Sequence, residues 1–452
     1  MTHATARLIC SLSRTRRLLL RSTSPIPPSL EPPDEPPSVR HPQSPARSPA
    51  RRLSRDDDRR PSFDTRRTGA AARAGASRAA LRPRRYERRS DKNQPSAETG
   101  ELGFQDGYDR SFLTITTGFG ARVFELLGVP ADQRPQDLQP IPWDALHDTP
   151  DKSDNGDVLL QVCSDNAYIN EHVLRRVQEE LADTFTVAWV VQGHQRYNSR
   201  QGRVSRTEGR ALIGFLDGTS NLNPGRSEDD AGLIFVDPAR VGEYPLLPQP
   251  GQPNPYGGPQ PPQFPGDLRP APTHEPEWAL NGTYCVVRAS TIDTPRWDRE
   301  TLDTQEHVVG RFKFSGASLD LADDDAQLHA DPAFATNPAD ERVPIGAHVR
   351  KANPRTSADL AHRIFRRGYP LIESAVDELR RGLVFICFAR TISTQFEFIT
   401  RAWTTNPDFP RPGAGIDPLR AYEHVLCGGY FFVPPISSTS KPWSWVLPET
   451  AV

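Results

Sequence analysis

Apolar and polar positions in the first half of the chain follow a pattern that predicts strands around one helix. Residues 112–120 and 158–163 are short β-branched or apolar runs, which is typical of strands. From Val173 onward apolar side chains recur four apart, with Asn170 as the expected cap, which predicts an amphipathic helix. Residues 184–192 return to strand character. We therefore expect an α+β layer in this part of the chain.

The second half of the chain repeats this style. The expected elements are a strand over 282–288, a short helix over 301–311, a strand over 383–389, a helix from Ser393 to Trp403 and a strand over 428–433. The run 383–389 is apolar without alternation, which indicates burial on both faces. Two such halves, each a sheet with helices on one face, can bury a ligand between them.

Two segments lie outside these halves, one before the first half and one between the two. Residues 1–95 carry 22 Lys and Arg against nine acids and are rich in Pro, Ser and Ala, so they cannot bury enough apolar surface to fold. We expect a disordered tail there, with a transit segment or a mis-called start as further interpretations. Proline and glycine crowd residues 244–277, which predicts a surface loop between a first half at 96–243 and a second at 278–452.

Composition limits which cellular compartment and which partners we expect for this protein. The run Leu18–Leu20 is too short for a secretory signal or a membrane span. Five cysteines are scattered singly, which argues against a thiolate metal site and favours a reducing compartment. A cytoplasmic location is expected, with mitochondrial and secreted locations left open. No folded nucleic-acid-binding motif is recognisable beside the basic tail, so no nucleic-acid partner is expected.

The segment GFLDGTSN (214–221) places a carboxylate between glycines, directly after an apolar run. Glycines allow a sharp turn and a close approach to a flat ligand, and apolar neighbours keep water away from Asp217. A tight turn in which the aspartate binds its own backbone is the alternative interpretation.

A second charged segment, AHVRKANPR (347–355), lies further along the chain, with histidines upstream. A lone histidine is most often a surface or structural residue. An aspartate in an apolar loop, a histidine in an acidic loop and an arginine on a later segment are nevertheless the three parts that an iron porphyrin oxidant needs. Imidazole holds the iron, a carboxylate moves the peroxide proton, and a guanidinium stabilises the departing oxygen.

These segments resemble the dye-decolorizing (DyP-type) haem peroxidases. Besides GFLDGTSN and AHVRKANPR, the resemblance rests on RRGYP (366–370), LVFICFART (383–391) and GGYFF (428–432). It covers residues 97–445, and AWTTNPDFP (402–410) is most like the larger fungal-type and related bacterial branch. It implies an α+β fold of two ferredoxin-like halves, with antiparallel sheets packed around a haem pocket in a dimeric α+β barrel-like arrangement.

The resemblance also implies roles for individual residues. It gives Asp217 as the distal carboxylate, Arg350 as the distal arginine and His329, 21 residues before Arg350, as the proximal iron ligand. His348 is expected to be a structural residue or to lie at the haem edge, with the role of iron ligand as the alternative. Residues two apart on a strand share a face, so His348 is expected on the side of the haem that holds Arg350 if this stretch is extended.

Further cofactor contacts follow from the same resemblance. A proximal histidine normally donates its other N–H to an acid or a carbonyl. Where several branches of the family place an acid this chain has a threonine, so Asp417 is the substitute, with a turn-forming aspartate as the alternative. Arg355 and Arg311 are candidates for the haem propionates. Gly218 and Phe388 complete the expected cofactor contacts.

The implied cofactor is haem b (heme b, iron protoporphyrin IX), and the implied partners are hydrogen peroxide and an organic reductant such as a dye or phenol. The expected protein is a DyP-type peroxidase that works by one-electron steps, without a membrane partner; a homo-oligomer is left open. Trp403, Trp297, Tyr369 and Tyr422 are candidate electron relays, with packing as the alternative role. The alternative function is a haem-binding or haem-handling protein without peroxidase turnover, which would keep His329.

The resemblance also implies a strand and a helix ahead of residues 112–120. Residues 1–95 show neither in their sequence pattern. Losing them would leave an exposed sheet edge, so we expect 96–243 to be a truncated half.

Overall fold

The computed structural model describes residues 3–13, 112–196, 209–244, 256, 262–337, 339, 341–374 and 379–435. The strands in this part are β1 (His3–Ser13), β2 (Thr114–Phe119), β3 (Val158–Ser164), β4 (Thr186–Arg196), β5 (Thr283–Ile292), β6 (Phe365–Arg366), β7 (Tyr369–Ser374), β8 (Leu379–Ala389) and β9 (Glu423–Val433). The α-helices are α1 (Ala121–Leu126), α2 (Ala167–Leu181), α3 (Glu228–Gly232), α4 (Thr294–Trp297), α5 (Leu302–Val309) and α6 (His348–Ala352).

Shorter helical turns join these elements. Seven of them are η1 (Ala131–Gln133), η2 (Asp144–Leu146), η3 (Pro238–Glu243), η4 (Glu277–Ala279), η5 (Asp325–Gln327), η6 (Ala333–Ala335) and η7 (Asp359–His362). The remaining three lie near the candidate site and are η8 (Ile392–Glu397), η9 (Ile399–Thr404) and η10 (Pro418–Tyr422). None of the described helices is both long enough and apolar enough to cross a lipid bilayer.

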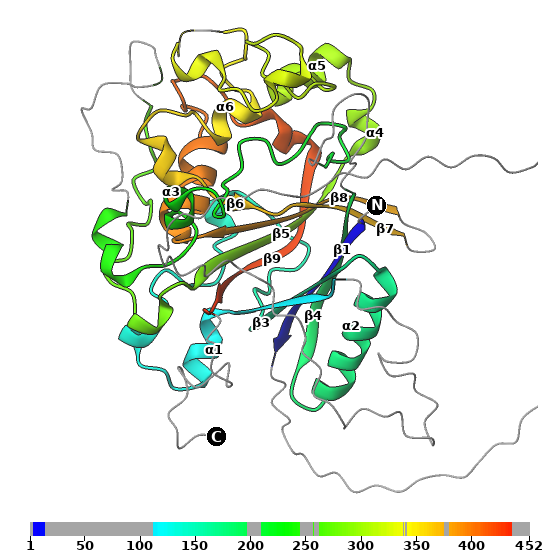
Figure 1. The fold of residues 1–452 in the computed structure, drawn as a ribbon, viewed down its shortest axis with the longest axis vertical. Coiled ribbons are helices and arrows are strands. Elements are labelled where there is room, and N and C mark those ends of the chain that lie inside the picture. Colours follow the sequence, from blue (N-terminus) through cyan, green and yellow to red (C-terminus); the bar gives the residue numbers. More distant parts are fainter. Residues whose placement is uncertain are drawn as a thin grey trace, which may run out of the picture. The chain divides into compact units, whose positions relative to one another are not determined.

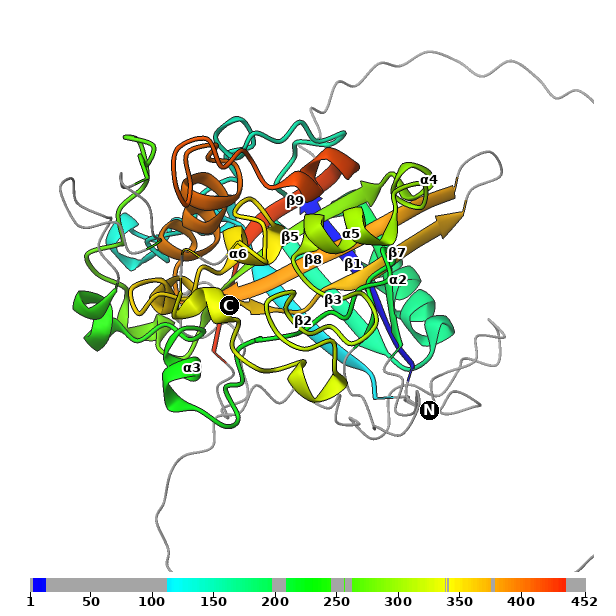
Figure 2. The ribbon, with the colours of Figure 1, turned by 90° about the horizontal axis from the view of Figure 1, so that it is seen from above.

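The strands pair antiparallel in the order β5-β9-β2-β3-β1-β4-β7-β8-β6, and β5 also pairs with β8. This extra pairing closes eight of the described strands into a ring, and Figure 2 shows β5, β8 and β9 side by side. The first half has the order β4-β1-β3-β2, and the second half has the matching order β9-β5-β8-β7. Both halves therefore have the ferredoxin-like arrangement, and the predicted α+β class with a barrel-like sheet is confirmed.

The first strand of the first half comes from the predicted tail. Within 1–95 the structure describes His3–Ser13 as β1, which pairs with β3 and β4 along most of its length. Thr5, for example, lies opposite Ser164 on one side and His194 on the other. The expectation of a disordered tail therefore does not hold for these eleven residues, and the rest of 1–95 lies outside the described residues. Backbone pairing with two neighbours explains how a segment without a clear strand pattern can join a sheet.

Two predicted helices occur with different starts. Helix α2 begins at Ala167 because the Asn166 side chain accepts a hydrogen bond from Tyr168 N, whereas Asn170 is buried inside the helix. The predicted helix from Ser393 occurs as η8 and η9, which are π-helical and run from Ile392 to Thr404. Helix α2 packs against β1 and β3, as Figure 1 shows for the first half.

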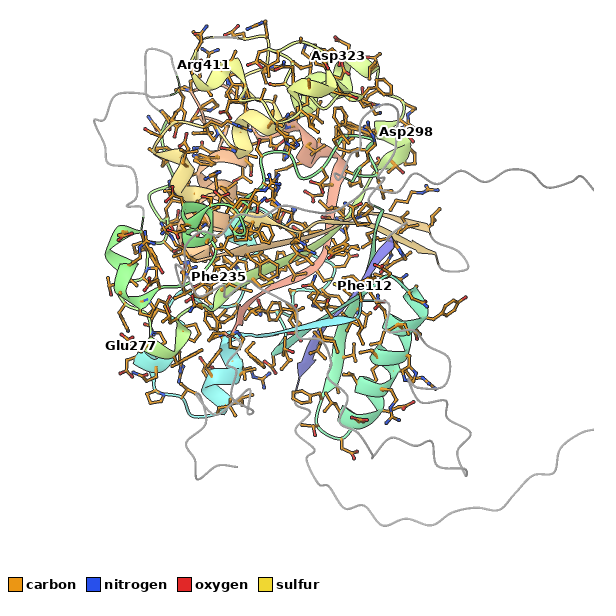
Figure 3. All side chains as sticks on the ribbon, viewed as in Figure 1. Phe112, Phe235, Glu277, Asp298, Asp323 and Arg411 are labelled. Atoms are coloured by element: carbon orange, nitrogen blue, oxygen red, sulfur yellow. The ribbon has the colours of Figure 1, made fainter. Side chains whose placement is uncertain are left out.

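The barrel interior is filled by apolar side chains from both halves. One of the two large buried clusters joins β3, β4, β5, β8 and β9, with Leu159, Trp189, Val287, Ile386 and Phe431 among its members. Phe235, labelled in Figure 3, packs against this cluster. The space between the two sheets is therefore a packed core, and a ligand has to lie elsewhere.

The predicted loop at 244–277 is described in part. Residues 245–255 and 257–261 lie outside the described residues, while residues 262–276 are described and are mostly half-buried or exposed. Arg269 from this stretch forms ion pairs with Asp137 at 3.0 Å and Glu397 at 2.7 Å, so it joins the first half to the helix over 392–404. The loop is thus held at the junction of the two halves.

Candidate functional site

A cavity of about 330 Å³ lies beside the barrel, on the outer face of the second half. Side chains from β5, β8, α6, η8 and η9 line it, together with the loop at 211–220 from the first half. One wall is apolar and includes Leu383, Phe385, Phe396 and Ile399. The remaining lining is strongly polar, and it includes several residues that the sequence analysis singled out.

Asp217 lines this cavity on the turn that the glycines of GFLDGTSN allow. Gly214 and Gly218 have φ values of 89° and 85°, which side-chain-bearing residues rarely adopt. The Asp217 Oδ1 atom accepts a hydrogen bond from Gly218 N at 2.7 Å. This contact fits the turn interpretation, and the turn brings the half-buried Asp217 side chain to the cavity.

Arg366 lies on the same wall and is fixed to the loop that carries Asp217. Its guanidinium donates to Thr219 O at 3.0 Å, and its backbone N–H donates to Asn221 Oδ1 at 2.9 Å. A Cβ atom added at Gly368 would lie 3.3 Å from Asp217 Oδ2, which places the turn after Arg366 directly against that carboxylate. A carboxylate and a guanidinium thus share one side of the cavity.

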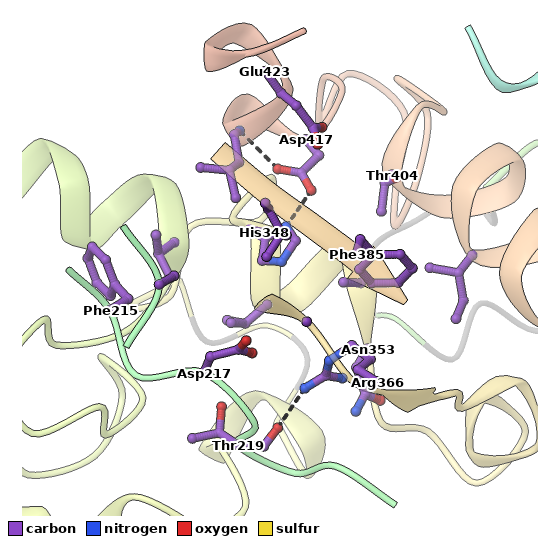
Figure 4. A pocket seen from close by; sticks show the side chains of 18 of the residues that line it. Phe215, Asp217, Thr219, His348, Asn353, Arg366, Phe385, Thr404, Asp417 and Glu423 are labelled. Carbon is purple, nitrogen blue, oxygen red and sulfur yellow. Dashed lines mark hydrogen bonds and ion pairs between the residues drawn. The ribbon is translucent and has the colours of Figure 1, made fainter. Parts of the chain in front are cut away.

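His348 lies across the cavity from these two groups. Its Nδ1 atom is 2.6 Å from Asp417 Oδ2, and the Asp417 side chain is only 3 % exposed. Figure 4 shows the His348 ring between Asp417 and the part of the cavity that holds Asp217 and Arg366. Burial lowers the pKa of His348, but the Asp417 carboxylate outweighs this effect and raises the pKa overall. A neutral ring that donates from Nδ1 to this carboxylate has Nε2 as its metal-binding atom.

Arg350 and His329 do not line the cavity. Residues 348–352 form helix α6, not a strand, so residues two apart point about 200° away from each other and do not share a face. Arg350 is 3 % exposed, donates to Val343 O at 3.0 Å and covers the Phe334 ring. His329 is exposed on the acidic loop. The sequence-based assignment of these two residues to the haem therefore does not fit the geometry.

Gly218 and Phe388 also lie outside the cavity lining. Gly218 acts through its backbone, as the donor to Asp217. On β8 side chains alternate between the two faces, so Phe388 packs into the barrel core while Phe385, three residues earlier, lines the cavity. The apolar run of 383–389 does indicate burial on both faces, as predicted, but its pattern alone did not tell which face meets the cavity.

Of the four candidate electron relays, one lines the cavity and three do not. Trp403 lines the cavity, whereas Trp297, Tyr369 and Tyr422 belong to the surrounding packing. The rings of Trp297 and Tyr422 meet edge to face at 5.0 Å. No described contact distinguishes these four aromatic residues as a connected path to the surface.

Six arginines and three acids are among the described residues that line the cavity. Arg311 is 4 % exposed, its Nε atom has no hydrogen-bond partner among the described residues, and burial lowers its pKa to about 10. Arg355 lies close to it and donates to Asp331 at 2.6 Å and to Ser220 at 2.6 Å. A bound anion at this point would supply the missing charge, because a planar guanidinium matches a carboxylate.

The cavity therefore fits a haem better than a bare ion. Among the described residues no group of three His, Cys, Asp or Glu side chains could hold a metal by itself. A macrocycle that brings its own four nitrogens needs a single imidazole, an apolar wall and partners for its propionates. His348, the apolar wall and the pair Arg311 and Arg355 provide these three features.

The sequence analysis gave His348 only as the alternative ligand and did not name Arg366 as a site residue, whereas both line the cavity. Both lie in segments that carried the resemblance, AHVRKANPR and RRGYP, so the signal was present. The choice of His329 rested on its spacing from Arg350, and the placing of His348 beside Arg350 rested on an extended stretch, where the structure has a helix.

Comparisons with known proteins match both halves of the chain. The family model described as Dyp-type peroxidase, N-terminal, matches residues 67–195, and the model described as Dyp-type peroxidase, C-terminal, matches residues 265–438. A curated deferrochelatase from Shigella sonnei is 27 % identical over 350 residues, which cover 75 % of this chain and 69 % of that protein.

Solved structures add two similar folds. Ferric DtpA from Streptomyces lividans is 26 % identical with a TM-score of 0.55, covering 73 % of this chain and 76 % of that one. A DyP-type peroxidase from Cellulomonas bogoriensis has a TM-score of 0.54 at 24 % identity, covers 76 % of this chain and 82 % of that one, and supports the fold alone.

The two family matches together span most of the part that follows the basic tail. They confirm the predicted enzyme class, an oxidoreductase with peroxide as acceptor, and the predicted cofactor, haem b. The predicted fungal-type branch is not tested by them and stays a prediction. The chain belongs to the Dyp-type peroxidase family.

Proposed function

We propose that this chain reduces hydrogen peroxide at a haem held by His348, with Asp217 and Arg366 as the distal pair, and oxidises small organic reductants such as phenols or dyes. One observation carries the proposal. An imidazole held by a buried carboxylate faces a cavity whose opposite wall presents a second carboxylate and a guanidinium. This assignment replaces His329 and Arg350, which the sequence favoured.

Each residue has a defined task in this proposal. His348 would bind the iron through Nε2, while Asp417 keeps the proton on Nδ1 and makes the ring a stronger ligand. Arg311 and Arg355 would bind the propionates. The haem, when bound, supplies the redox centre that accepts electrons from the reductant one at a time.

The distal pair acts on the peroxide. The Asp217 carboxylate would take a proton from one peroxide oxygen and deliver it to the other, so that water can leave. The Arg366 guanidinium, fixed by Thr219 and Asn221, would stabilise negative charge on the departing oxygen. Two one-electron steps from the reductant then complete the cycle, and the balance is one peroxide and two reductant molecules to two waters and two oxidised reductants.

A pair of histidine variants tests the assignment. The protein is loaded with hemin, and the Soret band and peroxidase rate are recorded for His348→Ala and His329→Ala. We expect His348→Ala to lose the absorption spectrum of histidine-ligated haem and the peroxidase activity. We expect His329→Ala to match the parent in both. The reverse result would return the ligand to His329.

A second candidate function is haem handling without peroxidase turnover. The observation that favours it is the similarity to a curated relative named deferrochelatase. Asp217→Asn separates the two candidates, because a peroxidase loses turnover while the haem spectrum persists, whereas a haem-handling protein keeps its function. The oligomeric state stays open, and the cytoplasmic location stays a prediction.

A further inference from the structure

Lys351 is a completely buried lysine on the helix that carries His348. It lies three residues after His348 on α6 and is 0 % exposed. A buried ammonium is costly unless all three of its hydrogens find acceptors. The structure provides three carbonyl acceptors, and all of them belong to one loop.

The acceptors are the carbonyls of Asn406, Phe409 and Gly415. The first two lie 2.7 and 2.8 Å from the Lys351 Nζ atom, and the third is closer still. The loop that contains them begins after η9 and ends at Asp417, two residues beyond Gly415. One side chain therefore ties the whole loop to α6.

The same loop presents Asp417 to His348. Asp417 N donates to Thr404 O at 2.8 Å, and its Oδ1 atom accepts from Leu419 N at 3.0 Å, which leaves Oδ2 for His348 at 2.6 Å. The relative position of this carboxylate and this imidazole thus depends on how the loop lies against α6. Lys351 makes three of the hydrogen bonds that join α6 to this loop.

We propose that Lys351 is a positioning residue for the axial histidine, acting through the 404–417 loop and Asp417. The inference rests on the proposed role of His348 as iron ligand. Without the ammonium, three carbonyls lose their shared donor, the loop relaxes and the hydrogen bond from His348 to Asp417 lengthens. A weaker hydrogen bond makes the imidazole a poorer electron donor to iron.

The test measures the iron–histidine bond directly, in haem-loaded protein. Resonance Raman spectra of the ferrous form report the iron–histidine stretching frequency for the parent, Lys351→Met, Asp417→Asn and the double variant. We expect Lys351→Met to shift the frequency downward, toward that of Asp417→Asn, and to add nothing in the double variant. Additive shifts, or an unchanged frequency in Lys351→Met, would overturn the proposal.

Two further variants keep the result interpretable. Lys313→Met removes another partly buried lysine, whose Nζ atom binds Gln305 away from Asp417, and it should leave the frequency unchanged. If Lys351→Met does not fold, Gly415→Ala disturbs the clamp from the loop side. Gly415 has a φ of 80°, and an added Cβ atom would meet nothing within 4 Å, so only the backbone is strained. It should lower the frequency, and an unchanged value would overturn the proposal.

The proposed function fails separately from this inference. If His348→Ala keeps the parent's iron–histidine band, His348 is not the ligand and the proposed function fails. If His348→Ala loses the band while Lys351→Met leaves it unshifted, only the role of Lys351 fails.

Discussion

Asn221 binds the backbone of Arg366 with both ends of its amide. Its Nδ2 atom donates to Arg366 O at 2.8 Å, and its Oδ1 atom accepts from Arg366 N at 2.9 Å. The two residues are 145 positions apart in the chain. This pairing joins the GFLDGTSN loop to the RRGYP segment, and it brings an acid and a guanidinium to one wall of the cavity.

Arg366 and Arg350 make a matched test of which arginine acts on peroxide. Arg366→Gln should lower the rate with peroxide by about 100-fold, as expected when a stabilising donor is lost, without reducing haem content. Arg350→Gln should keep the rate per bound haem but lower the free energy of unfolding by about 1–3 kcal/mol, because a buried donor to Val343 O is removed. Stopped-flow mixing with peroxide and urea unfolding measure the two effects; an activity loss confined to Arg350→Gln would return the role to that residue.

Arg311 should lower the free energy of unfolding of the haem-free protein and raise its affinity for haem. Its Nε atom is buried and has no hydrogen-bond partner within the part of the chain that the structure describes, so Arg311→Met should raise the free energy of unfolding of the haem-free protein by about 1 kcal/mol. The same change should weaken haem binding roughly 10- to 100-fold, because a charged hydrogen bond to a propionate is lost. Hemin titration and urea unfolding give both values. Arg355→Met is the control, since Arg355 already pairs with Asp331 and its loss should give no gain in stability.

Phe385 and Phe388 should respond differently to truncation. Phe388→Ala removes a ring from the barrel core and should cost about 3–5 kcal/mol in unfolding free energy. Phe385→Ala opens the cavity wall, so it should cost less stability but speed the transfer of haem to excess apomyoglobin. Faster haem transfer in Phe388→Ala than in Phe385→Ala would contradict the assignment of the two faces of β8.

Glu275 should make stability fall as pH rises. Burial raises the pKa of Glu275 from 4.5 to about 7, although it accepts hydrogen bonds from Tyr284 at 2.6 Å and Gln136 N at 3.2 Å. The folded state therefore binds this proton more tightly than the unfolded state, so the contribution is complete below pH 4.5 and is lost as pH rises to about 7.

Replacing this carboxyl group by an amide measures the effect. Glu275→Gln should be more stable relative to the parent at pH 8 than at pH 5, by up to about 3 kcal/mol. Urea unfolding at the two pH values gives this difference. The exposed neighbour Glu277→Gln should show no such pH dependence. Equal effects of Glu275→Gln at both pH values would mean that the buried group does not titrate in this range.

Strands β2 and β3 and the turn that carries Asp217 could be predicted from the sequence, because local patterns determine them. The β-branched runs at 114–119 and 158–164 form β2 and β3, and the glycines around Asp217 give the turn that directs its carboxylate to the cavity. A family resemblance in ordered segments also sufficed for the fold class and the cofactor. These features depend on residues close together in sequence.

Only the tertiary structure decided which histidine and which arginine face the cavity. A helix at 348–352 turns Arg350 away from His348, while long-range contacts bring Asp417 to His348 and Arg366 to Asn221. The pairing of β1 with β3 and β4 is likewise a long-range contact, and the sequence pattern of residues 3–13 did not predict it. Spacing alone cannot separate a helix from a strand over five residues, because the choice depends on what packs against them.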